Sequence, residues 1–239
     1  MARIRLSVDH PLAQGQALPL TGDQAHYLFS VMRQGPGAEV RVFNSRDGEW
    51  SARVDQVGRR AGVLSVQAQT APQQNPPDLW LIFAPIKKAR TDFIVEKAAE
   101  MGAARIVPVQ TDFTNAERIR QDRLQAHAVE AAEQCGGTFV PEVAELVPLP
   151  RLLDRWDTGR RILWADESRV GPASTLAGQA RGPWAILIGP EGGFSPAERS
   201  RIGAMPWVTP VSLGPRILRA DTAAVAALAL WQAALGDWG

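Results

Sequence analysis

The sequence predicts an α/β protein in which a small β-rich domain precedes a larger domain with a mainly parallel sheet. Short runs of alternating apolar and polar residues dominate the chain up to about residue 70. Beyond a proline-rich stretch, continuous apolar runs alternate with segments of helical character, a pattern typical of strand–helix units. The 239 residues are enough to bury a core in each part.

The boundary between the two predicted domains lies in Thr70-Ala-Pro-Gln-Gln-Asn-Pro-Pro77. Its three prolines disfavour both a helix and a central strand, because proline has no backbone N–H. We therefore predict one domain over residues 1–71 and a second over residues 72–239.

The first domain is predicted to be a small β-barrel. Its strands are expected at 39–43, 49–54 and 62–67, separated by glycine-containing turns such as Arg46-Asp-Gly48. One helical piece, about residues 22–33, interrupts them.

The second domain is predicted to alternate strands with helices. Strands are expected at 79–84, 105–109, 161–165, 184–188 and 208–213, and helices at 91–101, 117–134, from Ser195 onward and 221–235. Thr91 is a candidate N-cap, and Ser195-Pro-Ala-Glu198 has the pattern of a capping box. The helix 221–235 has almost no polar face, so we expect it to be buried.

The composition excludes several classes of protein. With 26 basic and 25 acidic residues the net charge is +1, so a nucleic-acid partner would require locally gathered basic side chains. All but three of the basic residues are arginine, which suits RNA but also follows from genome base composition. Cys135 is the single cysteine, and His10, His26 and His127 lack metal-ligand spacing, so we expect no disulfide and no metal site. The N-terminus lacks the apolar core of a signal peptide, and no apolar stretch reaches the roughly 20 residues of a membrane span, so we expect a cytoplasmic protein.

Two glycine-containing turns are the strongest candidates for a ligand site. Leu187-Ile-Gly-Pro-Glu-Gly-Gly-Phe-Ser195 joins a buried strand to a capped helix, and its glycines would let a ligand approach the backbone. It has neither GxGxxG spacing nor a P-loop lysine, and by itself it is better explained as a tight turn. Val211-Ser-Leu-Gly-Pro-Arg-Ile-Leu-Arg219 repeats the arrangement at the end of the next strand. The residues that follow it, Asp221 or Thr222, are equally expected as a helix N-cap.

Both turns resemble the ribosomal RNA small-subunit methyltransferase E family, which belongs to the knotted SPOUT methyltransferases. Ile188-Gly-Pro-Glu-Gly-Gly193 and Leu213-Gly-Pro-Arg-Ile-Leu-Arg219 carry its most specific motifs. The resemblance extends over nearly the whole chain, through His26-Tyr-Leu-Phe-Ser-Val-Met-Arg33, Lys97-Ala-Ala-Glu-Met-Gly102 and Glu130-Ala-Ala-Glu-Gln-Cys-Gly136.

The resemblance implies a trefoil-knotted SPOUT domain behind an N-terminal PUA-like RNA-binding barrel. It implies S-adenosylmethionine as cofactor, N3 of a uridine in 16S ribosomal RNA as target, and a homodimer whose interface borders the pocket. The cofactor residues that it implies are Leu163, Ala165, Glu167, Ile188, Gly189, Glu191, Gly192, Gly193, Leu213, Gly214, Ile217, Leu218 and Thr222.

The same resemblance implies two kinds of catalytic group. Uridine N3 carries a proton, so a carboxylate, Asp221 or Glu191, is expected to accept it. Arg219 is expected to stabilise charge that develops on the uracil carbonyls. RNA contacts are expected at Arg3, Arg5, His26, Arg33, Arg46, Arg118 and Arg120.

The chain departs from the family pattern at three positions. Gly137 and Leu124 stand where the family often has arginine and tryptophan, and Ala220-Asp221-Thr222 stands where it often has Thr-Glu-Thr. Two other functions remain open, a SPOUT ribose 2′-O-methyltransferase and a non-catalytic RNA-binding assembly factor.

Overall fold

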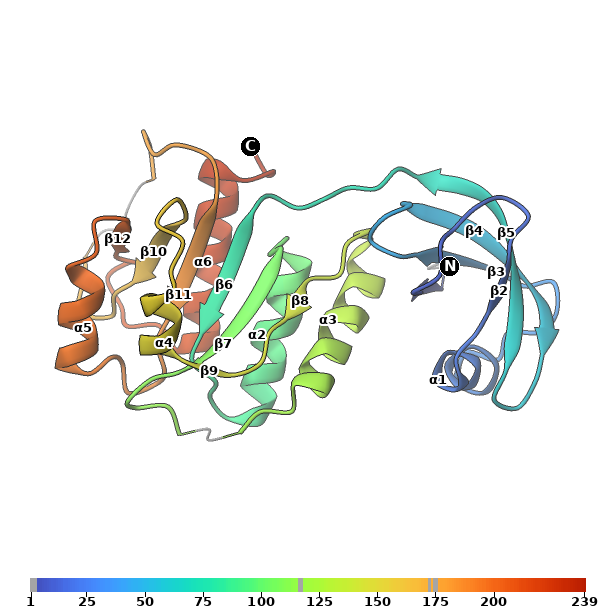
Figure 1. Cartoon of the computed structure of the whole chain (residues 1–239), viewed down its shortest axis with the longest axis horizontal. Coiled ribbons are helices and arrows are strands. Elements are labelled where there is room, and N and C mark those ends of the chain that lie inside the picture. Colours follow the sequence, from blue (N-terminus) through green and yellow to red (C-terminus); the bar gives the residue numbers. More distant parts are fainter. Residues whose placement is uncertain (1–3, 116–117, 172, 174–175) are drawn as a thin grey trace. The chain divides into compact units, whose positions relative to one another are not determined.

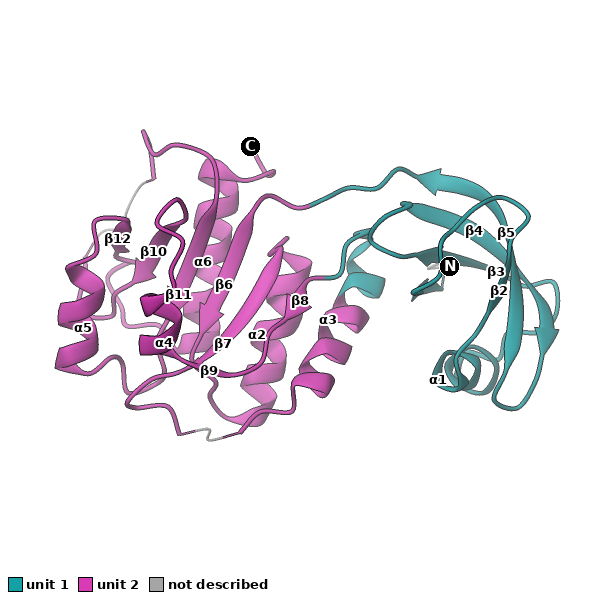
Figure 2. Ribbon diagram, viewed as in Figure 1, with its two compact units in different colours: residues 1–75, 132–140 teal, residues 76–131, 141–239 magenta. Residues whose placement is uncertain are grey.

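The chain folds into two compact units in the computed structural model, which describes residues 4–115, 118–171, 173 and 176–239. Unit 1 comprises residues 1–75 and 132–140, and unit 2 comprises residues 76–131 and 141–239 (Figure 2). Besides the N-terminal stretch, unit 1 therefore includes a short segment from the middle of the chain. No helix in the described ranges is long and apolar enough to cross a membrane.

Unit 1 is built on one curled five-stranded sheet with the order β1-β3-β4-β5-β2. The strands are β1 (Arg5–Ser7), β2 (Ala17–Pro19), β3 (Glu39–Phe43), β4 (Glu49–Val57) and β5 (Gly62–Ala71). β1 runs parallel to β3, and the other neighbours are antiparallel. Alternate side chains such as Leu18, Val42 and Leu64 are fully buried in a single core. The three strands predicted from alternating hydrophobicity are confirmed.

The helical piece of unit 1 is only partly regular. A short helix α1 (Gly22–Ala25) begins with a capping box between Thr21 and Gln24, and it continues as a π-helix, η1 (His26–Val31). Met32 N donates to Tyr27 O, the i to i+5 bond that defines this form. The segment ends at Arg33, whose φ of 53° is left-handed. The predicted helix is therefore present, but after residue 25 it is a π-helix and not the expected α-helix.

Arg5 attaches the second segment of unit 1 to its sheet. Its guanidinium donates to the backbone oxygens of Ala132 at 2.7 Å, Glu133 at 3.1 Å and Gly137 at 2.7 Å, and to Glu49 Oε2 at 2.7 Å. Ala132 and Glu133 lie in the last turn of α3 (Gln121–Cys135), where carbonyl oxygens lack helical partners, and Gly137 follows it. The Arg5 side chain is 11% exposed and holds the framework of unit 1 together, and the predicted RNA contact stays a prediction.

Unit 2 is built on a seven-stranded sheet of parallel strands in the order β12-β10-β11-β6-β7-β8, with β9 paired to β7. The strands are β6 (Leu79–Phe83), β7 (Arg105–Gln110), β8 (Glu142–Val143), β9 (Val147–Pro148), β10 (Arg161–Ala165), β11 (Trp184–Ile188) and β12 (Val208–Val211). Every residue of β11 is buried. The continuous apolar runs of the sequence therefore correspond to strands covered on both faces.

Helices cover both faces of this sheet (Figure 1). α4 (Leu149–Asp154) and α5 (Pro196–Gly203) share one core with β6, β7, β10 and β11. α2 (Lys88–Glu100) and α6 (Ala220–Leu235) pack against each other, and α6 also contacts β11. β8, β9 and α4 were not predicted, because each is too short to show a period.

Three predicted helix starts need correction. α2 begins at Lys88, and Thr91 lies inside it with its hydroxyl hydrogen-bonded to the backbone N and O of Ile86. α3 begins at Gln121, and Glu117, the predicted start, lies outside the described residues. α6 begins at Ala220 with Arg219 at the N-cap, so Asp221 and Thr222 belong to its first turn.

The end of the chain returns across the sheet in the way that a trefoil knot requires. β12 lies at the sheet edge beside β10, whereas α6, which follows it, packs on β11 and α2. The segment between them therefore passes the carboxyl end of β10 and its connection to β11. Gly171 N, in that connection, donates to Gly214 O at 3.3 Å.

The start of α5 is fixed by the side chain of Ser195. Its Oγ accepts from Glu198 N at 3.3 Å and donates to Asp112 Oδ2 at 2.5 Å, while Glu198 Oε2 accepts from Ser195 N at 2.9 Å. This confirms the predicted capping box. The same side chain also attaches the loop after β7 to α5.

We expect Ser195→Ala to lower the free energy of unfolding by about 1–2 kcal/mol, because it removes the cap and leaves a carboxylate without its donor. Urea titration followed by circular dichroism measures the change. Ser200→Ala, at an exposed position of the same helix, is the matched control and should shift the midpoint little. Equal midpoints for the two variants would contradict the role assigned to Ser195.

Candidate functional site

Three strand ends of unit 2 meet around one cavity at the carboxyl edge of the sheet. β10 leads into Glu167, β11 into the turn 189–193, and β12 into the turn 213–219. They enclose two adjoining hollows of about 250 Å³ and 40 Å³, which share Ala165, Glu167, Ile217, Leu218 and Ala223. We call these together the strand-end cavity. Ligands of open parallel sheets bind at this edge.

Most of the predicted cofactor residues line the strand-end cavity. They are Ala165, Glu167, Ile188, Gly189, Glu191, Gly193, Leu213, Gly214, Ile217 and Leu218, joined by the predicted catalytic residue Arg219. Prediction from the sequence missed other lining residues, which include Arg169, Pro190, Arg216, Ala220 and Ala223.

Three predicted cofactor residues lie outside this lining. Leu163 is fully buried in β10, two residues before Ala165 and thus about 6–7 Å inside the sheet edge. Gly192 faces Phe113, whose Cβ lies 3.3 Å from the position of an added Cβ. Thr222 is exposed on α6, where Ala223 faces the cavity instead.

Two of the glycines are required by the shape of the cavity wall. Gly193 has a φ of +72°, and a Cβ there would lie 2.6 Å from Glu167 Oε1. A Cβ at Gly189 would lie 2.7 Å from the Phe194 ring. Any other residue would strain the backbone at position 193 and displace the Phe194 ring at position 189, so the turn is more specialised than a simple tight turn.

A partly buried ion-pair network supports the β10 side of the cavity. Arg199 of α5 bonds to Asp166 and, at 2.5 Å, to Glu167. Burial alone would raise the pKa of Asp166, but hydrogen bonds from Ser168 and Arg199 outweigh burial and hold this pKa below its usual value. Burial likewise opposes the charge on Arg199, yet its hydrogen bond to Asp166 and the charge of Glu167 raise its pKa. Both groups therefore stay charged and hold the strand end against α5.

Arg90 links the two carboxylates that were predicted as proton acceptors. Its Nη1 donates to Glu191 Oε1 at 2.8 Å, and its Nε lies 3.7 Å from Asp221 Oδ2. Glu191 lines the cavity, whereas Asp221 lies beside it, with a side chain 20% exposed. Arg90 belongs to the first turn of α2 and stands 101 positions before Glu191, so sequence spacing gave no indication of the contact.

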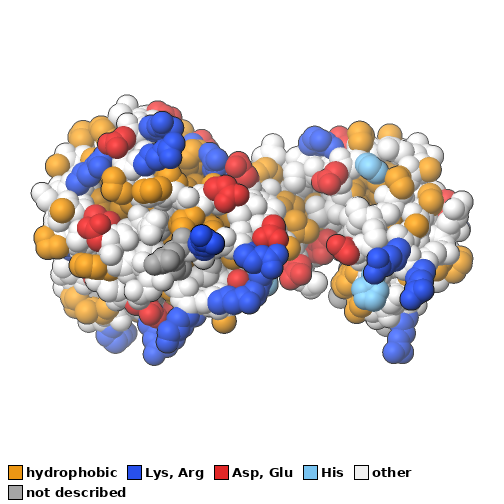
Figure 3. Space-filling view, turned by 60° about the horizontal axis from the view of Figure 1, so that its bottom comes forward, with side chains coloured by type: hydrophobic (Ala, Val, Ile, Leu, Met, Phe, Trp, Pro, Cys, Tyr) orange, Lys and Arg blue, Asp and Glu red, His pale blue; other side chains and the backbone are white. Residues whose placement is uncertain are grey.

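The predicted RNA-binding residues differ in how exposed they are, and most of those that the structure describes lie at the surface. In unit 1, His26, Arg33 and Arg46 are exposed, and in unit 2 Arg118 and Arg120 are exposed. Arg3 lies outside the described residues. The face in Figure 3 carries Lys and Arg in separate patches among acidic and apolar side chains, as expected for a nearly neutral chain. Within the described residues, no group of three His, Cys, Asp or Glu side chains is placed to share a metal ion.

Known proteins match both units of the chain. A family model described as an RNA methyltransferase domain matches residues 73–232, and one described as an RNA methyltransferase PUA domain matches residues 20–67. The proteins named ribosomal RNA small subunit methyltransferase E from Rickettsia conorii and a Synechocystis species are 27% and 30% identical. The first match covers 94% of this chain and 93% of that protein, and the second covers 88% and 71%.

A solved structure matches over the full length. It is a ribosomal RNA small subunit methyltransferase E from Neisseria gonorrhoeae bound to S-adenosyl methionine, at a TM-score of 0.89 and 25% identity, and the match covers 100% of both chains. The fold is thus an α/β SPOUT methyltransferase domain with an N-terminal PUA-like domain. The matched domain models and relatives together show that the chain belongs to the ribosomal RNA small subunit methyltransferase E family of RNA methyltransferases.

Proposed function

We propose that this protein transfers the methyl group of S-adenosylmethionine to N3 of a uridine in 16S ribosomal RNA of the small subunit. The observation that carries the proposal is the strand-end cavity, formed by the Gly-Pro turns in a chain of this family. Because the substrate is the ribosomal small subunit, we place the reaction in the cytoplasm.

The residues of the strand-end cavity fit the proposed cofactor. Ile188, Ile217 and Leu218 offer apolar surface for an adenine ring, and Glu167 and Glu191 offer acceptors for hydroxyl and ammonium groups. The absence of side chains at Gly189 and Gly193 lets Phe194 and Glu167 pack against the turn that forms the cavity wall. When bound, S-adenosylmethionine supplies a methyl group already activated by a positively charged sulfur.

The residues of the chain have to position the uridine and accept its N3 proton. Positioning a nucleophile in line with its target is worth roughly 7–11 kcal/mol. Glu191 is better placed than Asp221 to accept the proton, because Glu191 lines the cavity and Arg90 fixes its carboxylate. Arg219, at the mouth of the same cavity, would stabilise negative charge on a uracil carbonyl.

We expect Arg219→Ala to lower the single-turnover methylation rate by roughly 10²–10³-fold while cofactor affinity measured by calorimetry stays unchanged, since a positioned donor to a developing charge contributes about this much. Glu191→Gln should lower the single-turnover rate by about 10²-fold or more, and this loss should exceed the loss caused by Asp221→Asn. Arg155→Ala, at an exposed position after α4, is the control and should keep the wild-type rate. Near-normal rates for both carboxylate variants would contradict the carboxylate as proton acceptor.

The identity of the methylated nucleoside tests the reaction itself. Small ribosomal subunits from cells that lack this gene are incubated with labelled S-adenosylmethionine, and digested RNA is analysed by mass spectrometry. We expect 3-methyluridine. A 2′-O-methylated nucleoside would identify a ribose methyltransferase instead. Absence of transfer together with absence of cofactor binding would favour an RNA-binding assembly factor.

The outer face of α6 supports the proposed homodimer. One face of this helix is buried on the sheet, yet Val225, Ala226, Ala229 and Leu230 on the other side are only half-buried in a single chain. Ile217, in the turn before α6, is 73% exposed. A helix that is apolar all round is expected to be covered on all sides, and a second copy would cover this face beside the cavity.

We expect the wild-type protein to elute as a dimer, with its mass measured by light scattering, and Ala229→Arg to shift it to a monomer, because the larger charged side chain would be buried in the interface. Ala197→Arg, at an exposed position of α5, is the matched control and should remain dimeric. A monomeric wild-type protein at micromolar concentration would contradict the dimer.

A further inference from the structure

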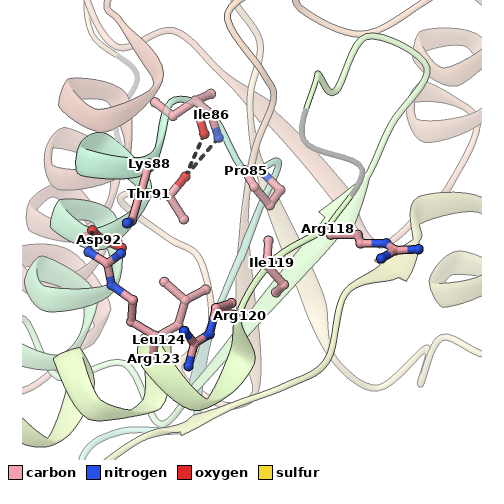
Figure 4. Close-up of a pocket in the computed structure, with 10 residues that line it drawn as sticks. All are labelled: Pro85, Ile86, Lys88, Thr91, Asp92, Arg118, Ile119, Arg120, Arg123 and Leu124. Atoms are coloured by element: carbon pink, nitrogen blue, oxygen red, sulfur yellow. Dashed lines mark hydrogen bonds and ion pairs between the residues drawn. The ribbon is translucent and has the colours of Figure 1, made fainter.

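A second pocket of unit 2 lies between the first turns of α2 and α3 (Figure 4). Its volume is about 410 Å³, within the range of small-ligand sites. We call it the α2–α3 pocket, and it is lined by Pro85, Ile86, Lys88, Thr91, Asp92, Arg118, Ile119, Arg120, Arg123 and Leu124. None of these residues lines the strand-end cavity.

The lining carries four cations and one carboxylate, so its net charge is strongly positive. Arg123 is held by Asp92 at 2.6 Å, and Arg120 pairs with Asp122 at 2.6 Å. Lys88 and Arg118 form no ion pair with any other residue whose side chain the structure describes. They stand on opposite sides of the pocket in Figure 4. These two cations are free to bind an anion.

The remaining lining is apolar. Pro85 and Ile86 follow β6, while Ile119 and Leu124 flank the start of α3. The Thr91 hydroxyl accepts from Ile86 N at 3.0 Å and donates to Ile86 O at 3.1 Å, and these two hydrogen bonds keep this wall in place. A flat apolar group would lie against Ile86 and Ile119 while an attached anion would reach Lys88 or Arg118. A nucleotide combines these two features.

The first turn of α2 lines the α2–α3 pocket and contacts a residue that lines the strand-end cavity. Lys88 lines the pocket, and Arg90, two positions later, contacts Glu191 of the cavity. Two helical positions are about 200° apart, so the two side chains leave the helix on nearly opposite sides. A single RNA strand that crosses this turn would reach both sites.

We propose that the α2–α3 pocket binds one nucleotide of the RNA substrate, a neighbour of the methylated one, with its base against Ile86 and Ile119 and its phosphate on either Lys88 or Arg118. This inference rests on the proposed function, because it takes the strand-end cavity as the place of methyl transfer. Single-stranded RNA is recognised in this manner when its bases are unstacked.

Equilibrium binding to small ribosomal subunits, measured without S-adenosylmethionine over a series of salt concentrations, tests the charged side of the pocket. The double variant Lys88→Ala/Arg118→Ala should bind more weakly, and its plot of log K against log salt should be flatter by roughly 0.7 for one lost phosphate contact. Arg181→Ala, an exposed arginine at the opposite edge of the sheet, is the control and should keep the wild-type slope.

The apolar side is tested separately with Ile119→Ser. It should weaken binding about tenfold, because apolar burial is lost, and should leave the salt slope unchanged. Cofactor affinity of every variant, measured by calorimetry, reports whether unit 2 is intact. Unchanged binding by either variant would overturn the nucleotide site. Tight binding of free uridine or adenosine 5′-monophosphate, lost in the double variant, would also overturn it in favour of a free nucleotide. If the wild-type protein does not bind the subunits, the proposed function fails and this inference fails with it.

Discussion

The parallel pairing of β10 between β11 and β12 is the constraint on which the rest of unit 2 depends. Parallel strands end at the same edge, so this pairing brings three turns together that are separated by tens of residues in the chain. The turns can meet closely because Gly189 and Gly193 carry no side chains where Phe194 and Glu167 approach. Arg199 then holds the end of β10 against α5. The strand order thus brings the turns of the cavity together, and the residues within the turns then determine how closely they approach.

The same arrangement explains why the proposed catalytic groups lie on different elements. Glu191 follows β11, Arg219 precedes α6, and Arg90 belongs to α2. Each is near the cavity because its own element reaches the carboxyl edge of the sheet. Arg90 also connects this cavity to the α2–α3 pocket, since the first turn of α2 borders both. One helix turn therefore contributes Lys88 to the α2–α3 pocket and the Arg90 contact to Glu191 of the strand-end cavity.

The sequence was informative wherever a structure is determined by neighbouring residues. Ser195-Pro-Ala-Glu198 forms the predicted capping box because all its partners lie within four positions. The buried strands were predictable from unbroken apolar runs. The family resemblance predicted which residues form the cavity, and most of these residues line it.

The sequence-based predictions failed where contacts between residues distant in the chain determine the structure. Thr91 has the chemistry of an N-cap, but its hydroxyl bonds to Ile86 and the helix begins three residues earlier. Leu163 shares a strand face with Ala165, but it is fully buried and does not line the cavity. The Arg90–Glu191 pair joins residues 101 positions apart, which no local pattern can reveal. The π-helical turn after residue 25 is likewise invisible to a pattern that distinguishes helix from strand alone.

Because Arg5 attaches residues 132–140 to the sheet of residues 1–75, the N-terminal stretch is difficult to exchange between genes by itself. Four guanidinium hydrogen bonds join β1 to Glu49 and to backbone oxygens more than 120 positions away. A gene fragment cut at the proline-rich stretch would encode the sheet without the carbonyls of residues 132, 133 and 137, and a mostly buried cation would lose three of its four acceptors. The N-terminal part is therefore not an interchangeable module. Recombination that exchanged it between relatives would have to exchange the end of α3 as well, so the two parts are expected to have evolved as one inheritance unit.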